Sequence, residues 1–304
     1  MGPASENDGA HSIPSLSHWR DRLVLCCATS LLIFSTSLCA AESAIPSTLS
    51  ERVYSSTGKM PAKLAVFADC VARERVFGKV EQGLYYIDLP AGTSCTVLVG
   101  ERGWDSLPLQ VDDPSVAVAL PFLVYPREIP EPELAIELVQ MGTADQALRG
   151  KNWRQNDPNF LNRAQAEDGA RQHRLGEIIA AKGWPTLSMV GWEAANAAWL
   201  IAQHAPTPRL KSWLVLMNQA SLRHEIALYN LATSIDRVLV HDDRHQLYGT
   251  QYRLLANGAS CPYPTEDMDH LDHRRLTMGL PRNVLAQVAE CFDELRFIQK
   301  LPSG

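Results

Sequence analysis

The stretch Ala194-Ala-Asn-Ala-Ala-Trp-Leu-Ile-Ala-Gln-His204 is apolar over nearly its whole circumference when it is drawn as a helix. A helix that is apolar on every side is covered by other elements on every side. We therefore predict that this segment is the central helix of a bundle, with the polar pair Gln203 and His204 at its carboxyl end.

Apolar residues recur with helical spacing on both sides of this segment. Before it, the pattern predicts a helix that opens at Leu134 and a second helix over residues 164–181, which ends before Gly183 and Pro185. After it, apolar stripes at residues 210–217 and 228–239 predict two more, and a last helix is predicted near residues 284–299. The sequence thus predicts a helical domain of five or six helices over residues 134–300.

The residues that precede the helices follow a period of two instead. Leu64, Val66, Ala68 and Cys70 fall on one face of a strand, and further short strands separated by turn residues continue to residue 125. This spacing is typical of a small β-sandwich, which we predict over residues 63–125. We expect a flexible lead-in at residues 42–62 and a proline-rich linker at residues 126–133. The predicted fold class is therefore α+β in two separate domains, a β-sandwich followed by an all-α bundle.

The first 41 residues have the layout of a secretory signal peptide. Arg20 and Arg22 precede an uncharged apolar run at residues 23–34, and small residues follow it. The run is shorter than the ~20 residues of a transmembrane helix, so no stable membrane span is expected after the signal is removed. Cleavage after Ala41 predicts a periplasmic or secreted protein, and lipidation at Cys39 is the alternative.

Four of the seven cysteines lie outside the predicted signal. An even number in an exported protein suggests disulfide bonds. We predict the pairs Cys70–Cys95 and Cys261–Cys291, because each pair lies within one predicted domain. The alternative is four buried free thiols, since cysteine is among the most buried residue types.

Charge and motifs exclude several classes of function. The chain has 304 residues and a net charge of −6, without a Lys/Arg cluster, so we expect no nucleic-acid partner. No glycine-rich phosphate loop, GxSxG motif or zinc-type spacing of Cys and His occurs in the sequence. We expect no cofactor and no metal site.

Six segments of the helical half have a familiar order and spacing. They are Asp145-Gln-x2-Arg149, Gly183-Trp-Pro185, Ala198-Trp-Leu-Ile-Ala-Gln-His-Ala205, Asp236-Arg-Val-Leu-Val240, Gln246-x-Tyr-Gly-Thr-Gln251 and Arg274-Arg-x3-Gly-Leu280. Over about residues 134–290 the chain resembles a widespread bacterial family of unknown function. This resemblance implies an all-helical domain, often exported, without an established activity.

The polar residues of these segments are the candidate site. His204 is the candidate general acid or base, and Asp145 or Asp236 would orient its ring. Five further side chains are candidates to hold a substrate: Arg149, Gln203, Gln246, Tyr248 and Gln251. The alternative is a buried network that satisfies helix ends and the 246–251 loop, since buried polar groups need partners in any case.

Two functions follow from these alternatives. The first is an exported binding or interaction module for a protein, peptide or glycan partner. The second is a small hydrolase-like enzyme that uses His204 with Asp145 or Asp236.

Overall fold

The structure is a computed structural model that describes residues 47–152, 158–254, 260–282 and 291. The predicted signal peptide at residues 1–41 and the predicted last helix near residues 284–299 lie outside these residues.

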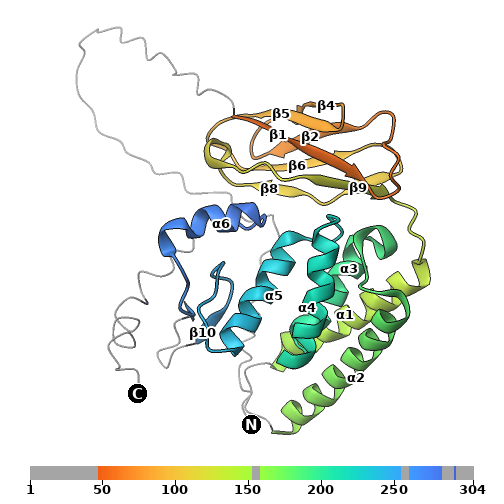
Figure 1. Cartoon of the computed structure of the whole chain (residues 1–304), viewed down its shortest axis with the longest axis vertical. Helices are drawn as coiled ribbons and strands as arrows, with labels where there is room; N and C mark the ends of the chain where they lie inside the picture. Colours follow the sequence, from red (N-terminus) through yellow and green to blue (C-terminus); the bar gives the residue numbers. More distant parts are fainter. Residues whose placement is uncertain (1–46, 153–157, 255–259, 283–290, 292–304) are drawn as a thin grey trace, which may run out of the picture. The chain divides into compact units, whose positions relative to one another are not determined.

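Two β-sheets form the region between residues 47 and 126 (Figure 1). One has the strand order β4-β5-β1-β9-β7 and the other the order β3-β2-β6-β8. The strands are β1 Ser47–Ser55, β2 Ala65–Cys70, β3 Val76–Phe77, β4 Lys79–Glu81, β5 Leu84–Leu89, β6 Cys95–Gly100, β7 Trp104–Ser106, β8 Leu109–Val111 and β9 Phe122–Pro126. Alternate residues of facing strands, such as Val66, Ile87 and Val97, are buried in one shared core. The predicted β-sandwich is confirmed.

The sandwich begins earlier than the sequence pattern indicates. Residues 47–55, expected within the flexible lead-in, form β1, which pairs with β5 on one side and with β9 on the other. Leu49 and Val53 are each 4% exposed, so they fill the core from this strand. The expectation of a flexible lead-in was wrong for residues 47–55. Leu49 and Val53 are the only two buried residues of this strand, so the sequence shows little alternation of apolar and polar residues here.

Both predicted disulfide bonds are present. Cys70 and Cys95 stand directly opposite each other on β2 and β6 and are joined. Cys261 is joined to Cys291.

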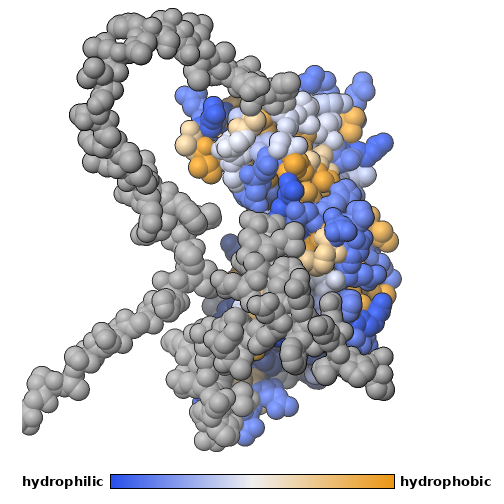
Figure 2. Space-filling model, turned by 90° about the vertical axis from the view of Figure 1, so that its left-hand side faces the viewer, coloured by the Kyte–Doolittle hydropathy of each residue, from blue (hydrophilic) through white to orange (hydrophobic). Residues whose placement is uncertain are grey.

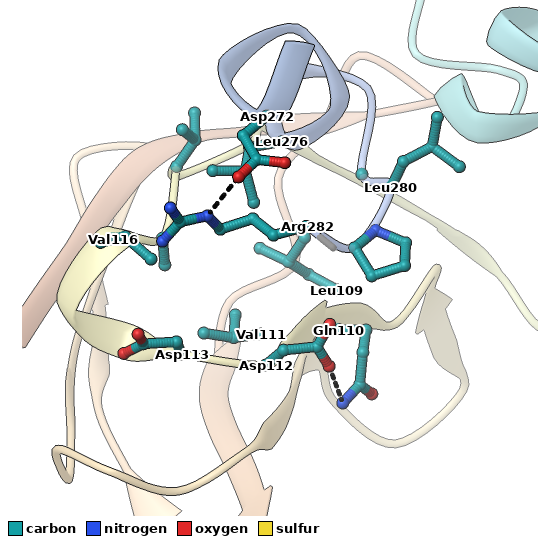
Figure 3. A pocket seen from close by; sticks show the side chains of 14 residues that line it. Leu109, Gln110, Val111, Asp112, Asp113, Val116, Asp272, Leu276, Leu280 and Arg282 are labelled. Atoms are coloured by element: carbon teal, nitrogen blue, oxygen red, sulfur yellow. Dashed lines mark hydrogen bonds and ion pairs between the residues drawn. The ribbon is translucent and has the colours of Figure 1, made fainter. Parts of the chain in front are cut away.

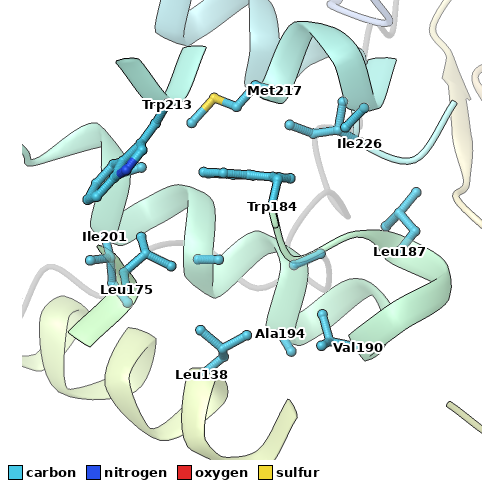
Figure 4. Packing of buried hydrophobic residues seen from close by; sticks show 14 of the residues in the cluster. Leu138, Leu175, Trp184, Leu187, Val190, Ala194, Ile201, Trp213, Met217 and Ile226 are labelled. Carbon is cyan, nitrogen blue, oxygen red and sulfur yellow. The ribbon is translucent and has the colours of Figure 1, made fainter. Parts of the chain in front are cut away.

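Five long helices follow the sandwich. They are α1 Pro132–Asn152, α2 Pro158–Lys182, α3 Leu187–Gln203, α4 Thr207–Ser221 and α5 Leu228–His241. The backbone of Gly191 has a φ of 76°, which sets the first turn of α3 apart from its longer apolar part. Trp184, in the turn between α2 and α3, packs beside Met217 and Ile226 in the core of this region (Figure 4).

The region after α5 corrects the expectation of an all-helical domain. Tyr252–Leu254 (β10) and Ser260–Pro262 (β11) form a two-stranded antiparallel sheet. A 3-10 turn at Met268–His270 (η2) and the short helix Leu271–Thr277 (α6) come next. The clear apolar periodicity ends with α5, and the helical prediction had been carried across this segment to a last helix near residues 284–299.

The sandwich and the helices share contacts. Leu123 and Tyr125 of β9 belong to the same buried cluster as the helical core, and the described residues form one compact unit. The division into two domains at a proline-rich linker therefore stays a prediction. Among the described helices, none has the length and apolar character needed to cross a membrane.

On the face shown in Figure 2, apolar residues form separate patches between hydrophilic ones wherever the surface is not drawn in grey. Since isolated apolar residues are normal on a protein surface, a functional site is better sought in the cavities.

Candidate functional site

Asp145 and His204 are brought together by the close packing of α1 against α3. Gly142 of α1 faces Ala197 of α3, and a Cβ atom on this glycine would lie 2.6 Å from the Cβ atom of Ala197. A glycine at this position lets the two helix backbones approach each other. Asp145 lies about one helical turn further along α1, and His204 follows the last residue of α3.

The two side chains form a carboxylate–imidazole pair. Asp145 Oδ1 lies 3.1 Å from His204 Nδ1, and Asp145 is only 1% exposed. Its other oxygen, Oδ2, accepts a hydrogen bond from Gln146 Nε2 at 2.9 Å. A carboxylate on Nδ1 fixes the orientation of the ring and directs Nε2 away from the carboxylate. Within the described part of the chain, no side chain or backbone group forms a hydrogen bond with His204 Nε2.

Arg149 connects this pair to a second carboxylate. Its Nη1 atom lies 2.9 Å from Asp145 Oδ1, and its Nη2 atom lies 2.8 Å from Asp168 Oδ2. Arg171 also binds Asp168, with Nη2 at 2.9 Å from Oδ1. Burial alone would raise the pKa of the Asp168 carboxyl, but the hydrogen bonds from Arg149 and Arg171 outweigh it and hold that pKa below its ordinary value.

His204 borders a cavity of about 820 Å³, which we call the His204 cavity. The His204 side chain is 21% exposed. Gln172 of α2 also borders it and donates from Nε2 to the backbone oxygen of His204 at 2.9 Å. The cavity is lined by Leu148, Arg149, Ala164, Gln165, Asp168, Gly169, Gln172, His173, His204, Pro206 and Arg209. Of these, only Arg149 and His204 were candidates from the sequence.

Asp236 lies in a different setting from Asp145. It is fully buried, and its two oxygens accept hydrogen bonds from the backbone N–H groups of Leu247, Tyr248 and Thr250 at 2.7 to 3.2 Å. The hydroxyl of Thr250 donates a further bond at 2.8 Å. Of the two carboxylates considered for His204, Asp145 is therefore the one in contact with it, while Asp236 organises the loop after α5.

Gln246 and Gln251 also belong to that loop. Gln246 is fully buried, its Nε2 donates to the backbone oxygens of Gln251 and Tyr263, and its Oε1 accepts from the backbone N–H of Gln251. Tyr248 is held through its backbone oxygen by Arg275, and burial raises the pKa of its phenol. These three candidates are engaged within the loop network.

Gln203, the neighbour of His204, points away from the cavity wall. Its Nε2 donates to the hydroxyl of Ser234 on α5, and the residue is 4% exposed. The candidates thus divide into two groups. Asp145, Arg149 and His204 meet at the cavity, whereas Gln203, Asp236, Gln246, Tyr248 and Gln251 form hydrogen bonds elsewhere.

Arg237 is a further residue that the sequence analysis did not select. The helical wheel of α5 predicts it on the side opposite the apolar stripe, but it is half-buried. Burial, together with the positive charge of nearby Arg149, lowers the pKa of its guanidinium. The sequence could have pointed to Arg237, because it directly follows Asp236 in one of the six segments that resemble the family.

A second cavity, of about 500 Å³, lies between β8 and the 3-10 turn Pro114–Val116 (η1) on one side and α6 on the other (Figure 3). Its charged groups are engaged with their neighbours: Asp113 accepts from Ser115, and Arg282 binds Asp272 at 3.1 Å. The hydrogen bonds from Ser115 hold the pKa of Asp113 below its ordinary value. This cavity contains no carboxylate–histidine pair.

The acidic and histidine-rich run at residues 267–273 forms ordinary ion pairs. His270 Nδ1 lies 2.9 Å from Asp267 Oδ2. In the described ranges, no three His, Cys, Asp or Glu side chains converge as a metal site requires.

Comparison with known proteins identifies one relationship. Residues 132–290 match the model of a family of unknown function, DUF6624. Neither the curated proteins nor the solved structures contain a match to the chain.

Proposed function

Since the chain belongs to the DUF6624 family, which matches more than half of it, we propose that its helical region binds a small polar ligand in the His204 cavity. One observation carries this proposal: His204 is oriented by buried Asp145 at the wall of a cavity of about 820 Å³. Small-molecule sites typically measure about 300–1,000 Å³ and contain a few convergent polar groups.

We propose further that this binding takes place outside the cytoplasm. The predicted signal peptide at residues 1–41 supports export, and the two disulfide bonds are typical of proteins in oxidising compartments. Cleavage after Ala41 would leave a free protein, and lipidation at Cys39 would leave it anchored.

A thermal-shift screen tests the binding role. A ligand that binds only the folded chain at 100 times its dissociation constant stabilises it by about 2.7 kcal/mol. We expect polar small molecules that raise the melting temperature of the parent and have little effect on His204→Gln. His241→Gln, at the exposed end of α5, is the matched control and should respond like the parent. Ligands that stabilise all three proteins equally would place binding elsewhere, and a screen without any hit would count against the proposal.

An acid–base enzyme is the second candidate, and the contact of Asp145 with Nδ1 favours it. A ring held in this way can accept a proton at Nε2 from water, whose oxygen attacks a substrate, and then return the proton to the leaving group. The described residues that line the cavity include no Ser, Thr or Cys, so water is the expected nucleophile.

A panel of chromogenic esters, phosphodiesters and glycosides separates enzyme from binding module. General acid–base catalysis contributes about 10²–10⁴-fold, so an activity of the parent should fall by this factor in His204→Gln. The His241→Gln control should keep full activity. Equal turnover by parent and His204→Gln would exclude His204 as the catalytic group.

A further inference from the structure

Gln172 has one hydrogen-bonding atom for which the described residues provide no partner. Its Nε2 is fixed as the donor to the backbone oxygen of His204, which assigns the amide orientation and makes Oε1 an acceptor. Gln172 is only 5% exposed and borders the His204 cavity, and no donor to its Oε1 is found in the described parts of the chain. Gln172 Oε1 is not among the fully buried polar atoms that lack a partner, so this oxygen is open to the cavity, where a ligand can donate a hydrogen bond to it.

The charged groups of the cavity wall are mostly paired with each other. Arg149 is shared between Asp145 and Asp168, and Asp168 also receives Arg171. Arg209 differs, because its guanidinium lies 5.9 Å from the centre of the Trp213 ring and no carboxylate partner is found among the described residues. The groups left for a ligand thus include the Gln172 acceptor, His204 Nε2 and the Arg209 donors, together with the exposed amide of Gln165.

This combination restricts the chemistry of the ligand. An ionised carboxylate carries no proton to donate to Gln172 Oε1. An ammonium group, in turn, cannot accept from Arg209. A hydroxyl both donates and accepts, so hydroxyl-bearing ligands match all of these groups.

Gln172 and His204 both border the cavity, and Gln172 Nε2 donates to the backbone oxygen of His204. A ligand with hydroxyls at several positions can therefore reach both side chains from within this one cavity. On the basis of the proposed ligand-binding role, we propose that the His204 cavity binds a saccharide through its hydroxyls. One hydroxyl donates to Gln172 Oε1, and another contacts His204 Nε2.

NMR titration of the full chain lacking the signal tests this inference. The probes are glucose, galactose, N-acetylglucosamine, maltose, cellobiose and chitobiose, with sodium phosphate, acetate and Gly-Gly for comparison. We expect at least one saccharide to shift the His204 ring signals. Its affinity should fall about tenfold in Gln172→Leu, which corresponds to one lost hydrogen bond. Gln219→Leu, an exposed glutamine on α4 outside the cavity, should bind like the parent.

A deoxy analogue of the bound saccharide separates direct contact from a structural effect of the substitution. The analogue should bind the parent about tenfold more weakly but bind Gln172→Leu as well as the complete sugar does, because both changes remove the same bond. Additive losses would overturn the role of Gln172. If phosphate, acetate or Gly-Gly shifts His204 and no saccharide does, the saccharide inference fails while ligand binding at His204 stands. If no probe shifts His204, the saccharide inference fails and the binding role loses its support as well.

Discussion

Asp145 Oδ1 receives two partners at once, His204 Nδ1 at 3.1 Å and Arg149 Nη1 at 2.9 Å. The carboxylate and the histidine are 59 positions apart in the sequence, and only the packing of α1 against α3 joins them. Because Asp145 is buried, its charge depends on these two neighbours for compensation.

Replacing this carboxylate should therefore destabilise the fold. For Asp145→Asn we expect a loss of about 1.5–3 kcal/mol in the free energy of unfolding, the range for hydrogen bonds to charged groups. Urea denaturation monitored by circular dichroism measures it. Glu167→Gln removes an exposed partner of Arg171 and should change stability by less than about 1 kcal/mol. Equal effects of the two substitutions would contradict the buried pairing of Asp145.

We expect a larger loss of stability when Asp236 is replaced, because both of its oxygens accept hydrogen bonds from backbone N–H groups of one loop. In Asp236→Asn the amide nitrogen would face N–H donors, so we expect a loss of about 3–6 kcal/mol, that of two hydrogen bonds to a charged group at about 1.5–3 kcal/mol each. Hydrogen exchange at Leu247, Tyr248 and Thr250 should accelerate with it. Asp243→Asn is the control, because Asp243 is exposed and its positive φ of 54° suits asparagine. Unchanged exchange at the loop in Asp236→Asn would refute the assignment.

The lowered pKa of Asp168 predicts a pH dependence of stability. The unfolded chain takes up a proton near the ordinary value of 3.8, whereas the folded chain does so at lower pH. The stabilisation from Asp168 is therefore complete above about pH 5 and is lost as the pH falls through the folded-state value. The difference in unfolding free energy between the parent and Asp168→Asn should shrink between about pH 5 and pH 3. A constant difference over this interval would mean that Arg149 and Arg171 do not stabilise the charged form.

The sequence was most informative where one periodicity dominates a long segment. The 3.6-residue pattern located the helices up to α5, and the period of two located β2 and β6 with their cysteines on the same face. β1 was missed because Leu49 and Val53 are its only deeply buried residues. A strand of this kind is stabilised by its two neighbours in the sheet, which a local pattern does not reveal.

The candidate site could be predicted only in part for a related reason. Helical spacing places Asp145 and Arg149 on one face of α1, but the choice between Asp145 and Asp236 as the partner of His204 depends on how separate helices pack. Asp168 and Gln172 continue the buried face of Leu175 on α2, and polar residues on a buried face are the signal that would have selected them. The burial of Arg237 near Arg149 depends on tertiary packing, which the helical spacing of α5 does not reveal.

Gly142 provides a test of the packing on which the whole site depends. In Gly142→Ala the new Cβ atom would meet Ala197 Cβ at 2.6 Å, so α1 must move away from α3. Overpacking of this kind typically costs about 1–3 kcal/mol, although alanine favours a helix over glycine by about 1 kcal/mol. Gly169→Ala on α2 is the matched control, because nothing lies within 4 Å of its added Cβ atom, and it should become more stable by up to about 1 kcal/mol. If Gly142→Ala is also stabilised, and its His204 ring signals match those of the parent, close contact between α1 and α3 does not position the Asp145–His204 pair.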